Sequence, residues 1–507
     1  MRKTRKSRSH SYTATRRKPI SLSATVTRKK VKPAVTVRMY RQGLGDCFLL
    51  TFAGADRPVH MLIDFGVIVG TPDAAAVMRR VAGDIKLATG GSATRRGHLD
   101  VVVVTHEHWD HISGFAQAKD IFEKEIDVDQ IWFAWTEEPG NARAQELKEE
   151  FGFQRRGLQQ ALRKWADAGI QPALREAVTG VVSFFGEPLA AGATTQDAMA
   201  RLTGRQGADF QYLVPGQAPF AVPGADGVRV YVLGPPSEAA FIKRLLPRKT
   251  EHEAYELRLS PARAFLAALE EPAAAGGDSE EQRRLAYPFD EYYRIPKAQA
   301  QGRTDDFFRR HYGFGPDPVN GWRRIDDDWL TVAGQLALDL DNWTNNTCLA
   351  LAFEIVATGD VLLFPGDAQV GNWASWKNVS FTVPDDGGGV KTVTARDLLR
   401  RTVLYKVGHH GSHNATHRSE GLELMESPDL VAMIPVNHEM AKKKKWNMPF
   451  PPLLERLEEK CHGRVIHQDR PIEDAVAAAG KVLSKRKVAR FKARVDGSDL
   501  FVECSFP

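Results

Sequence analysis

The sequence predicts a protein of the α/β class in which several strands end in polar residues. Short apolar runs rich in valine, isoleucine and leucine alternate with longer stretches in which apolar residues recur at helical spacing. Hydrophobic residues make up 43% of the chain and charged residues 26%, which is typical of a globular protein. At 507 residues the chain is long enough for one large domain or two ordinary ones.

The expected elements follow from this periodicity, taken in chain order. Strands are expected at 35–40, 42–52, 61–66, 101–104, 130–135, 228–234, 345–353, 359–364, 404–407, 431–436 and 464–469. Helices are expected at 72–90, 114–124, 142–152, 155–168 and 451–460. A C-terminal hairpin is expected from 488–495 and 500–504, around Asp496 and Gly497.

Positive charge is concentrated at the N-terminus. Residues 1–32 carry twelve of the 69 Lys and Arg residues and none of the 63 Asp and Glu residues, so the other residues carry 57 basic and 63 acidic side chains. We expect residues 1–34 to be a disordered basic tail and residues 35–507 to form the folded domain. The tail could bind phosphates as a nucleic-acid-binding arm, or it could only keep the chain in solution.

Composition also indicates where the protein works. The four cysteines, Cys47, Cys348, Cys461 and Cys504, are scattered and form no C-x-x-C pair, which favours a reducing compartment without disulfides. No apolar run approaches the ~20 residues of a membrane span. The basic N-terminus lacks the apolar stretch of a secretory signal. We therefore expect a cytoplasmic protein that does not enter a membrane.

Four potential metal ligands follow a strand of four valines. In residues 101–111 (VVVVTHEHWDH), the strand runs into a loop that holds His106, His108, Asp110 and His111. Imidazole and carboxylate groups suit Zn²⁺, Mn²⁺ or Fe. Adjacent side chains point in different directions, so we expect two ions, with His106 and His108 on one and Asp110 and His111 on the other. A polar loop with incidental histidines is the alternative, but buried polar groups need partners.

Two further strands end in an aspartate that has a glycine within two positions. Asp64 stands at the end of the strand at 61–66, where its carboxylate could hold a ligand histidine in one tautomer. Asp367 follows Gly366 after the strand at 359–364, and the glycine lets the chain approach an ion closely. We expect Asp367 to bridge the two ions. An ordinary turn aspartate is the alternative for both residues.

A pair of histidines follows the strand that begins at Leu404. One of His409 and His410 should complete the second metal site, and the other should contact a substrate oxygen or protonate the leaving group. The sequence leaves open which histidine has which role. Ser412 is a further candidate for substrate contact.

Two other features could bind a substrate or a partner. Lys442 and Lys443 begin a run of four lysines before Trp446, and this segment could hold a polyanion, although a solvated charge run is an equal alternative. Insertions are expected at about 140–222 and 237–340. The second of them could be a lid or a surface for a protein partner.

Taken in order, these motifs resemble the metallohydrolase domain of ComEC-type competence proteins, in the metallo-β-lactamase superfamily. The motifs are Gly43 to Phe48 (GLGDCF), Leu62 to Gly66 (LIDFG), Thr105 to His111 (THEHWDH), Asn345 to Thr347 (NNT), Gly366-Asp367 and Lys406 to Ser412 (KVGHHGS). The resemblance covers about residues 36–470. It implies an αββα sandwich with large helical insertions, a site at the strand ends and a two-metal phosphodiesterase or nuclease.

The chain also departs from that family. The membrane channel of the competence proteins is absent, so DNA uptake does not follow from the resemblance. The usual Asn-Asn-x-Ser is here Asn345-Asn-Thr-Cys348, and no obvious third histidine for the first metal lies between residues 111 and 367.

We therefore expect a hydrolase that cleaves phosphodiesters of nucleic acid or nucleotides, with water activated by two divalent ions, Zn²⁺ or Mn²⁺. The expected catalytic residues are Asp64, Asp110, His409 and His410. Two alternatives stay open. The same metal site could hydrolyse a carbon-centred ester, lactone or thioester, or the chain could be a non-catalytic partner protein that uses residues 237–340 as an interaction surface.

Overall fold

The computed structural model describes residues 33–168, 179–186, 194–244, 306–312, 323, 332–385 and 387–507. The chain divides into two units, Met1–Lys32 and Pro33–Pro507, and the described residues all belong to the second. The basic tail expected at 1–34 therefore lies outside the described residues, apart from its last two positions. Most of the insertion expected at 237–340, with the partner surface expected there, also lies outside them, whereas the insertion expected at 140–222 is described apart from residues 169–178 and 187–193.

An eight-stranded mixed sheet forms one half of the second unit. Its strands lie in the order β16-β17-β1-β2-β3-β4-β5-β6. Their bounds are β1 Val35–Tyr40, β2 Cys47–Phe52, β3 Val59–Phe65, β4 Gly97–Val103, β5 Ile126–Ala134, β6 Asp209–Leu213, β16 Val495–Gly497 and β17 Phe501–Phe506. Strands β3 to β6 run parallel to one another, whereas β17, β1, β2 and β3 pair antiparallel.

A seven-stranded mixed sheet forms the other half, in the order β15-β14-β13-β10-β9-β8-β7. Its strands are β7 Phe220–Val222, β8 Ala225–Gly234, β9 Ala350–Ile355, β10 Asp360–Phe364, β13 Thr402–Lys406, β14 Val431–Ile434 and β15 Val465–His467. Here β10, β13, β14 and β15 run parallel. Strands β11 (Ser380–Pro384) and β12 (Val390–Thr394) form a separate antiparallel pair.

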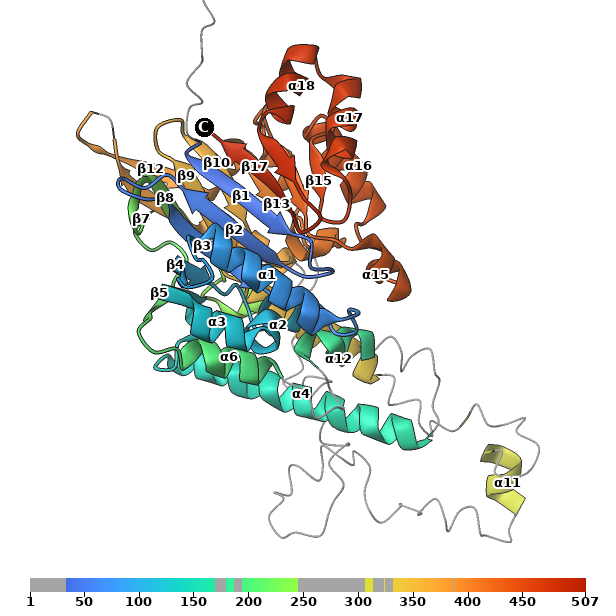
Figure 1. Ribbon diagram of the computed structural model, residues 1–507. Helices are drawn as coiled ribbons and strands as arrows, with labels where there is room; N and C mark the ends of the chain where they lie inside the picture. Colours follow the sequence, from blue (N-terminus) through green and yellow to red (C-terminus); the bar gives the residue numbers. More distant parts are fainter. Residues whose placement is uncertain are drawn as a thin grey trace, which may run out of the picture. The chain divides into compact units, whose positions relative to one another are not determined.

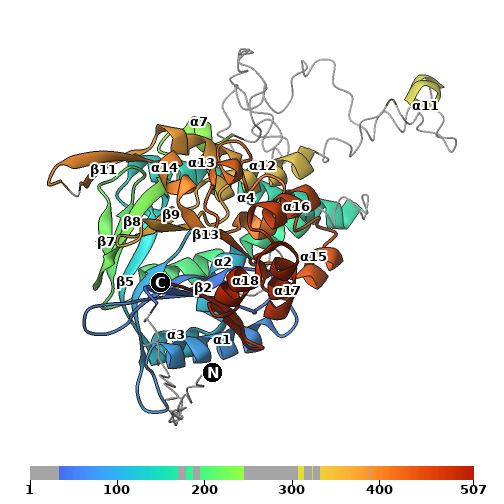
Figure 2. The ribbon, with the colours of Figure 1, turned by 90° about the horizontal axis from the view of Figure 1, so that it is seen from above.

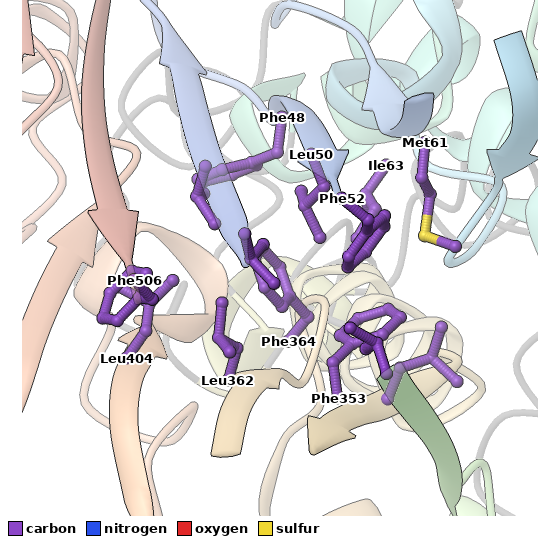
Figure 3. Packing of buried hydrophobic residues seen from close by; sticks show 14 of the residues in the cluster. Phe48, Leu50, Phe52, Met61, Ile63, Phe353, Leu362, Phe364, Leu404 and Phe506 are labelled. Atoms are coloured by element: carbon purple, nitrogen blue, oxygen red, sulfur yellow. The ribbon is translucent and has the colours of Figure 1, made fainter. Parts of the chain in front are cut away.

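The two sheets pack face to face around a buried core. Both contribute to one hydrophobic cluster, which includes Phe48 and Phe52 of the first sheet and Phe353 and Phe364 of the second (Figure 3). The ring centroids of Phe48 and Phe364 lie 5.7 Å apart at an angle of 84°. This edge-to-face geometry sets a positive ring edge against a negative ring face and adds to the stabilisation from burial. The strand ends of both sheets are thereby held in fixed positions.

Helices cover the outer face of each sheet (Figures 1 and 2). The first sheet packs against α1 (Ala74–Ala88), α2 (Trp109–Gln117), α3 (Lys119–Glu125) and α6 (Thr195–Thr203). The second packs against α13 (Val370–Ser375), α14 (Ala395–Arg400), α15 (His438–Lys443) and α16 (Pro451–Lys460). A separate cluster joins α4 (Ala142–Ala168), α7 (Ala239–Ile242) and α12 (Val332–Asn346). The predicted α/β class is confirmed.

Several elements differ from those expected. The strand expected at 488–495 is wrong, because Lys485–Lys492 form helix α18 and only Val495–Gly497 pair with β17. Apolar residues alternating with cations also fit a short helix that buries one side chain, here Phe491. The helices expected at 142–152 and 155–168 are one continuous helix, α4.

Two differences concern expected site residues. The segment that follows β4 is not all loop, because helix α2 begins at Trp109 and takes Asp110 and His111 into its first turn. Helix α12 continues to Asn346, so the strand expected at 345–353 begins only at Ala350.

Among the described residues, no helix combines the length and the apolar character needed to cross a membrane.

We expect Phe364→Ala to lower the free energy of unfolding by about 3–5 kcal/mol, because it leaves a cavity between the two sheets. Urea denaturation followed by circular dichroism would measure the change. Val390→Ala on β12 is the control, since Val390 is 73% exposed, and it should have almost no effect. Equal stability of the Phe364 variant and the wild type would contradict the packing of the sheets.

Candidate metal centre

The residues expected to bind metal lie at the ends of parallel strands. β3 and β4 pair parallel in the first sheet, and β10 and β13 pair parallel in the second. Parallel neighbours end at the same edge of a sheet, where α/β proteins place their ligands. Asp64 lies at the end of β3, His106 follows β4, Asp367 follows β10 and His409 follows β13. The packing of the two sheets brings these segments together.

The histidine-rich segment is buried and lies against β3. His108, Asp110 and His111 are 0% exposed and His106 is 1% exposed. A Cβ atom at Gly66 would lie 2.4 Å from the carbonyl carbon of Asp110, which is closer than any side chain tolerates. A glycine is thus needed at this position for the first turn of α2 to approach the end of β3.

Four of the expected ligands converge. Asp110, His111, Asp367 and His410 can each place one ligand atom within 4.8 Å of those of the other three, and all four side chains are buried. His111 Nε2 lies 3.0 Å from Asp367 Oδ2. His410 Nε2 lies 2.9 Å from Asp110 Oδ2. Two imidazoles and two carboxylates at this spacing could hold a metal ion.

Hydrogen bonds on the far side of each ring determine which nitrogen faces this group. His410 Nδ1 donates to the carbonyl oxygen of Pro435 at 2.6 Å, and His111 Nδ1 donates to Asp64 Oδ2 at 2.7 Å. In a neutral imidazole the other nitrogen, Nε2, then carries a lone pair. Both lone pairs would face carboxylate oxygens at close range, so a proton or a cation must lie between them. The donor set therefore fits a metal ion whose ligand histidines are oriented from behind.

The same carboxylates favour protonation of the two histidines. Burial alone would lower the pKa of His111, but the surrounding carboxylates, above all Asp367, outweigh it and raise the pKa well above 6.5. Burial of His410 is likewise outweighed, chiefly by its hydrogen bond to Asp110, and its pKa is raised. A proton and a metal ion would therefore compete for the same nitrogen atoms.

Lys406 and Asp46 belong to the buried group, although the sequence interpretation gave them no role in the site. Lys406 Nζ donates to the Gly366 carbonyl at 2.9 Å, to Asp367 Oδ1 at 3.1 Å and to Asp46 Oδ2. Asp367 Oδ1 also accepts from the backbone N–H of His409 at 2.9 Å. Asp367 Oδ2 is buried and has no hydrogen-bond partner among the described residues, so it could bind a metal ion. A lysine inside an apolar strand was the available signal, because a buried ammonium needs a carboxylate partner.

Three further side chains border the four-residue group. His106 Nε2, both ring nitrogens of His108 and Asp341 Oδ1 are buried and have no hydrogen-bond partner in the described part of the chain. Asp341, on helix α12, lies 4.0 Å from His108 Nε2 and was not predicted. Burial lowers the pKa of His108 to about 3, so its ring is neutral and can act as a ligand. His106 and His108 therefore stay predicted ligands of a separate ion.

His409 is held differently from His410. The amide nitrogen of Gln369 donates to His409 Nδ1 at 3.2 Å, while the amide oxygen accepts from Asn414 at 2.8 Å. The hydroxyl of Ser412, which was expected to contact a substrate, lies 3.2 Å from the same Nδ1 and donates to Asn414 Oδ1. A neutral His409 therefore carries its proton on Nε2, which is buried and has no partner among the described residues. Burial lowers the pKa of His409 to about 4, so the ring is neutral near pH 7.

Aromatic rings lie beside the site. Phe184 lies 5.6 Å from the ring of His409 and stacks on Trp446 at 5.0 Å and 11°. One face of Trp446, the residue that follows the lysine run, is thus covered by Phe184. Lys442 and Lys443 are exposed, and they lie in helix α15 rather than in a loop.

No family model matches this chain, and no curated protein matches it. The resemblance to the competence-protein metallohydrolase domain therefore rests on the motifs alone.

We expect metal affinity to rise with pH between about 6 and 8. His111 and His410 must be neutral to bind a metal, and their raised pKa values mean that protons compete more strongly as the pH falls. Each protonated histidine should change the affinity by about tenfold per pH unit. Competition with a chromogenic chelator at several pH values would measure this.

The metal-free protein should show the opposite trend in stability. Because the pKa values of His111 and His410 are raised in the folded state, protonation of these histidines stabilises that state. This stabilisation is fully present below about pH 6.5. That contribution is lost as the pH rises through the folded-state pKa. Thermal melting after treatment with a chelator would test this.

Metal affinity that did not change with pH would contradict the assignment of His111 and His410.

Proposed function

We propose that this chain is a hydrolase of the metallo-β-lactamase fold that cleaves phosphodiesters with two divalent metal ions, Zn²⁺ or Mn²⁺. The observation that carries the proposal is the convergence of Asp110, His111, Asp367 and His410, whose ligand atoms can lie within 4.8 Å of one another. Two sheets packed face to face, with helices on both outer faces, support the αββα sandwich that the motifs imply.

The charge of the buried group supports two ions rather than one. Asp46, Asp64, Asp110 and Asp367 are each at most 1% exposed, and Lys406 pairs with two of them. With neutral histidines, four carboxylates and one lysine carry a net charge of −3. Buried charge of this size is costly unless cations compensate it. One divalent ion leaves negative charge behind, and His106, His108 and Asp341 offer unpartnered atoms for a second.

The chain's own residues have distinct roles in this proposal. Asp110, His111, Asp367 and His410 would hold metal, which would supply Lewis-acid chemistry and lower the pKa of a water molecule. Asp64 orients His111 and Lys406 orients Asp367, so that Nε2 of His111 and Oδ2 of Asp367 would be available as ligand atoms. His409 acts as a neutral donor, whose Nε2–H can stabilise negative charge on a non-bridging oxygen or reach the leaving oxygen.

Nucleic acid or a nucleotide is the substrate class that the motifs and the charge distribution favour. The twelve cations of residues 1–32 and the lysine run that begins at Lys442 suit a polyanion. A cytoplasmic location, a protein partner at 237–340 and the absence of membrane contact stay predictions. A carbon-centred ester hydrolase and a non-catalytic partner protein are distinct outcomes of the experiment that follows.

We expect the full chain, loaded with Zn²⁺ or Mn²⁺, to cleave at least one substrate among single- and double-stranded DNA, RNA and cyclic dinucleotides. Asp367→Asn and His410→Ala should each lower the rate by about 10²–10³-fold or more, because they remove groups that stabilise the transition state. His98→Ala is the matched control. It lies at the opposite end of β4 from the site and should retain full activity.

The outcomes separate the three functions. Cleavage of a lactone or thioester with no cleavage of any phosphodiester would favour the carbon-centred hydrolase. If nothing is cleaved by the wild type or by the Asp367 variant, the protein is not an enzyme for these substrates. Elemental analysis of each sample would show whether metal binding was retained.

We expect Gln369→Glu to lower kcat by about 10²-fold while the metal content stays unchanged. A carboxylate at this position accepts from Nδ1 of His409 and moves the proton away from Nε2, so the donor is lost. Nitrogen NMR shifts of His409 would report the tautomer, which a merely structural defect would not change. Wild-type kcat in a variant with the shifted tautomer would contradict the role of the His409 donor.

A further inference from the structure

Helix α18 and the residues before it form a positively charged stretch on a negatively charged body. Residues 475–495 contain seven Lys and Arg residues and no Asp or Glu. Outside residues 1–32 the chain has 57 basic residues, so 50 remain outside this stretch, against 63 acidic ones. The remainder of the body would thus repel a polyanion, whereas this stretch would attract one.

The helix directs its cations to solvent. Helices α17 (Ile472–Val482) and α18 (Lys485–Lys492) pack against each other (Figure 1). Both helices also pack against β16. Phe491 is 3% exposed and joins the core between the sheets, so the apolar side of α18 faces inward. The exposed cations are Lys481, Lys485, Arg486, Lys487, Arg490 and Lys492.

Most of these cations have no acidic partner. Arg490 lies 3.5 Å from Asp429, which also contacts Arg464. Arg494 points inward, where it donates to the carbonyl oxygen of Ser505 at 2.7 Å. The remaining five cations of the stretch form no ion pair with an acid in the part of the chain that the structure describes: Lys481, Lys485, Arg486, Lys487 and Lys492. An exposed cluster of this kind is compensated by counterions, which a polyphosphate would displace.

We propose that this basic surface, Lys481 to Lys492, binds the phosphate backbone of nucleic acid without regard to sequence. This inference rests on the proposed function, and it makes the substrate a polymer rather than a free nucleotide. Lysine and arginine side chains on a rigid helix provide charge contacts to successive phosphates and no base-edge readout. The surface would hold the strand by its backbone while another part of it enters the metal centre.

A lipid surface is the less suitable anionic partner. An interfacial membrane helix needs an exposed apolar face beside its cations. The apolar residues of α18 are used internally, since Phe491 belongs to the core and Val488 is half-buried. Val482, 63% exposed, is the one large apolar side chain of the stretch that is exposed. The observations therefore favour a soluble polyanion.

The test is a charge-reversal variant of the full chain, Lys485→Glu with Arg486→Glu and Lys487→Glu. Acidic residues in the first turn of a helix are favourable, so α18 should stay folded. The control variant, Lys377→Glu with Lys391→Glu and Arg396→Glu, makes the same change in net charge at exposed residues of other elements. Fluorescence anisotropy with a phosphorothioate DNA duplex, which resists cleavage, would give Kd over a range of salt concentrations.

We expect the α18 variant to bind the duplex at least about tenfold more weakly near 0.1 M salt. The slope of log affinity against log salt concentration should also decrease, by the equivalent of about two to three phosphate contacts. The control variant should bind like the wild type. Equal losses in both variants, or no loss in either, would overturn the proposal. Loss of binding to phosphatidylserine vesicles with unchanged DNA binding would overturn it in favour of a membrane.

A small substrate separates this proposal from the proposed function. Hydrolysis of bis(p-nitrophenyl) phosphate requires the metal centre and not the basic surface, so the α18 variant should retain it. If the wild type hydrolyses no phosphodiester while the α18 variant still loses DNA binding, the surface stands and the hydrolase proposal fails. If the diester is hydrolysed and DNA binding is unchanged in the α18 variant, the surface proposal alone fails.

Discussion

The close approach of imidazole nitrogens to carboxylate oxygens, deep inside the protein, is the interaction on which the rest of the structure depends. His111 and His410 each use Nδ1 for a hydrogen bond on the far side of the ring, which turns Nε2 toward Asp367 and Asp110. Two lone pairs cannot face each other at about 3 Å without a positive charge between them. A cation or protons must therefore lie between these groups. The same contacts between imidazole and carboxylate thus determine both the stability of the centre and its chemistry.

The surrounding fold keeps these groups in place. The segments that carry Asp110, His111, Asp367 and His410 each follow a parallel strand, and the phenylalanines between the sheets fix the two sheets against each other. Gly66 lets the first turn of α2 lie against β3, and Lys406 holds one oxygen of Asp367 so that the other faces the centre. The backbone of Asp64, His409 and His410 has positive φ, a conformation that costs about 1–3 kcal/mol per residue and clusters at functional sites.

Neighbouring histidines have different chemistry because different residues contact their Nδ1 atoms. A backbone carbonyl makes His410 Nδ1 a donor and leaves Nε2 as a ligand, whereas the Gln369 amide makes His409 Nδ1 an acceptor and leaves Nε2 as a donor. A nitrogen atom that could bind a metal ion and a hydrogen-bond donor thus lie on adjacent residues. Charge is also distributed unevenly outside the centre, because the cations of α18 lie on one surface of a body that is otherwise acidic.

The sequence by itself determined the α/β class, most of the strands and the residue types of the candidate site. Valine runs, the glycines after Asp64 and before Asp367, and the spacing of His106 to His111 are local signals, because each reflects the backbone or burial of its own segment. Helix α18 was misread since its alternating pattern fits two periodicities. Only the tertiary structure decided that His410 joins Asp110, that His409 is a donor, and that Asp46, Asp341 and Lys406 lie at the centre. These depend on contacts between segments far apart in the chain, which local periodicity does not encode.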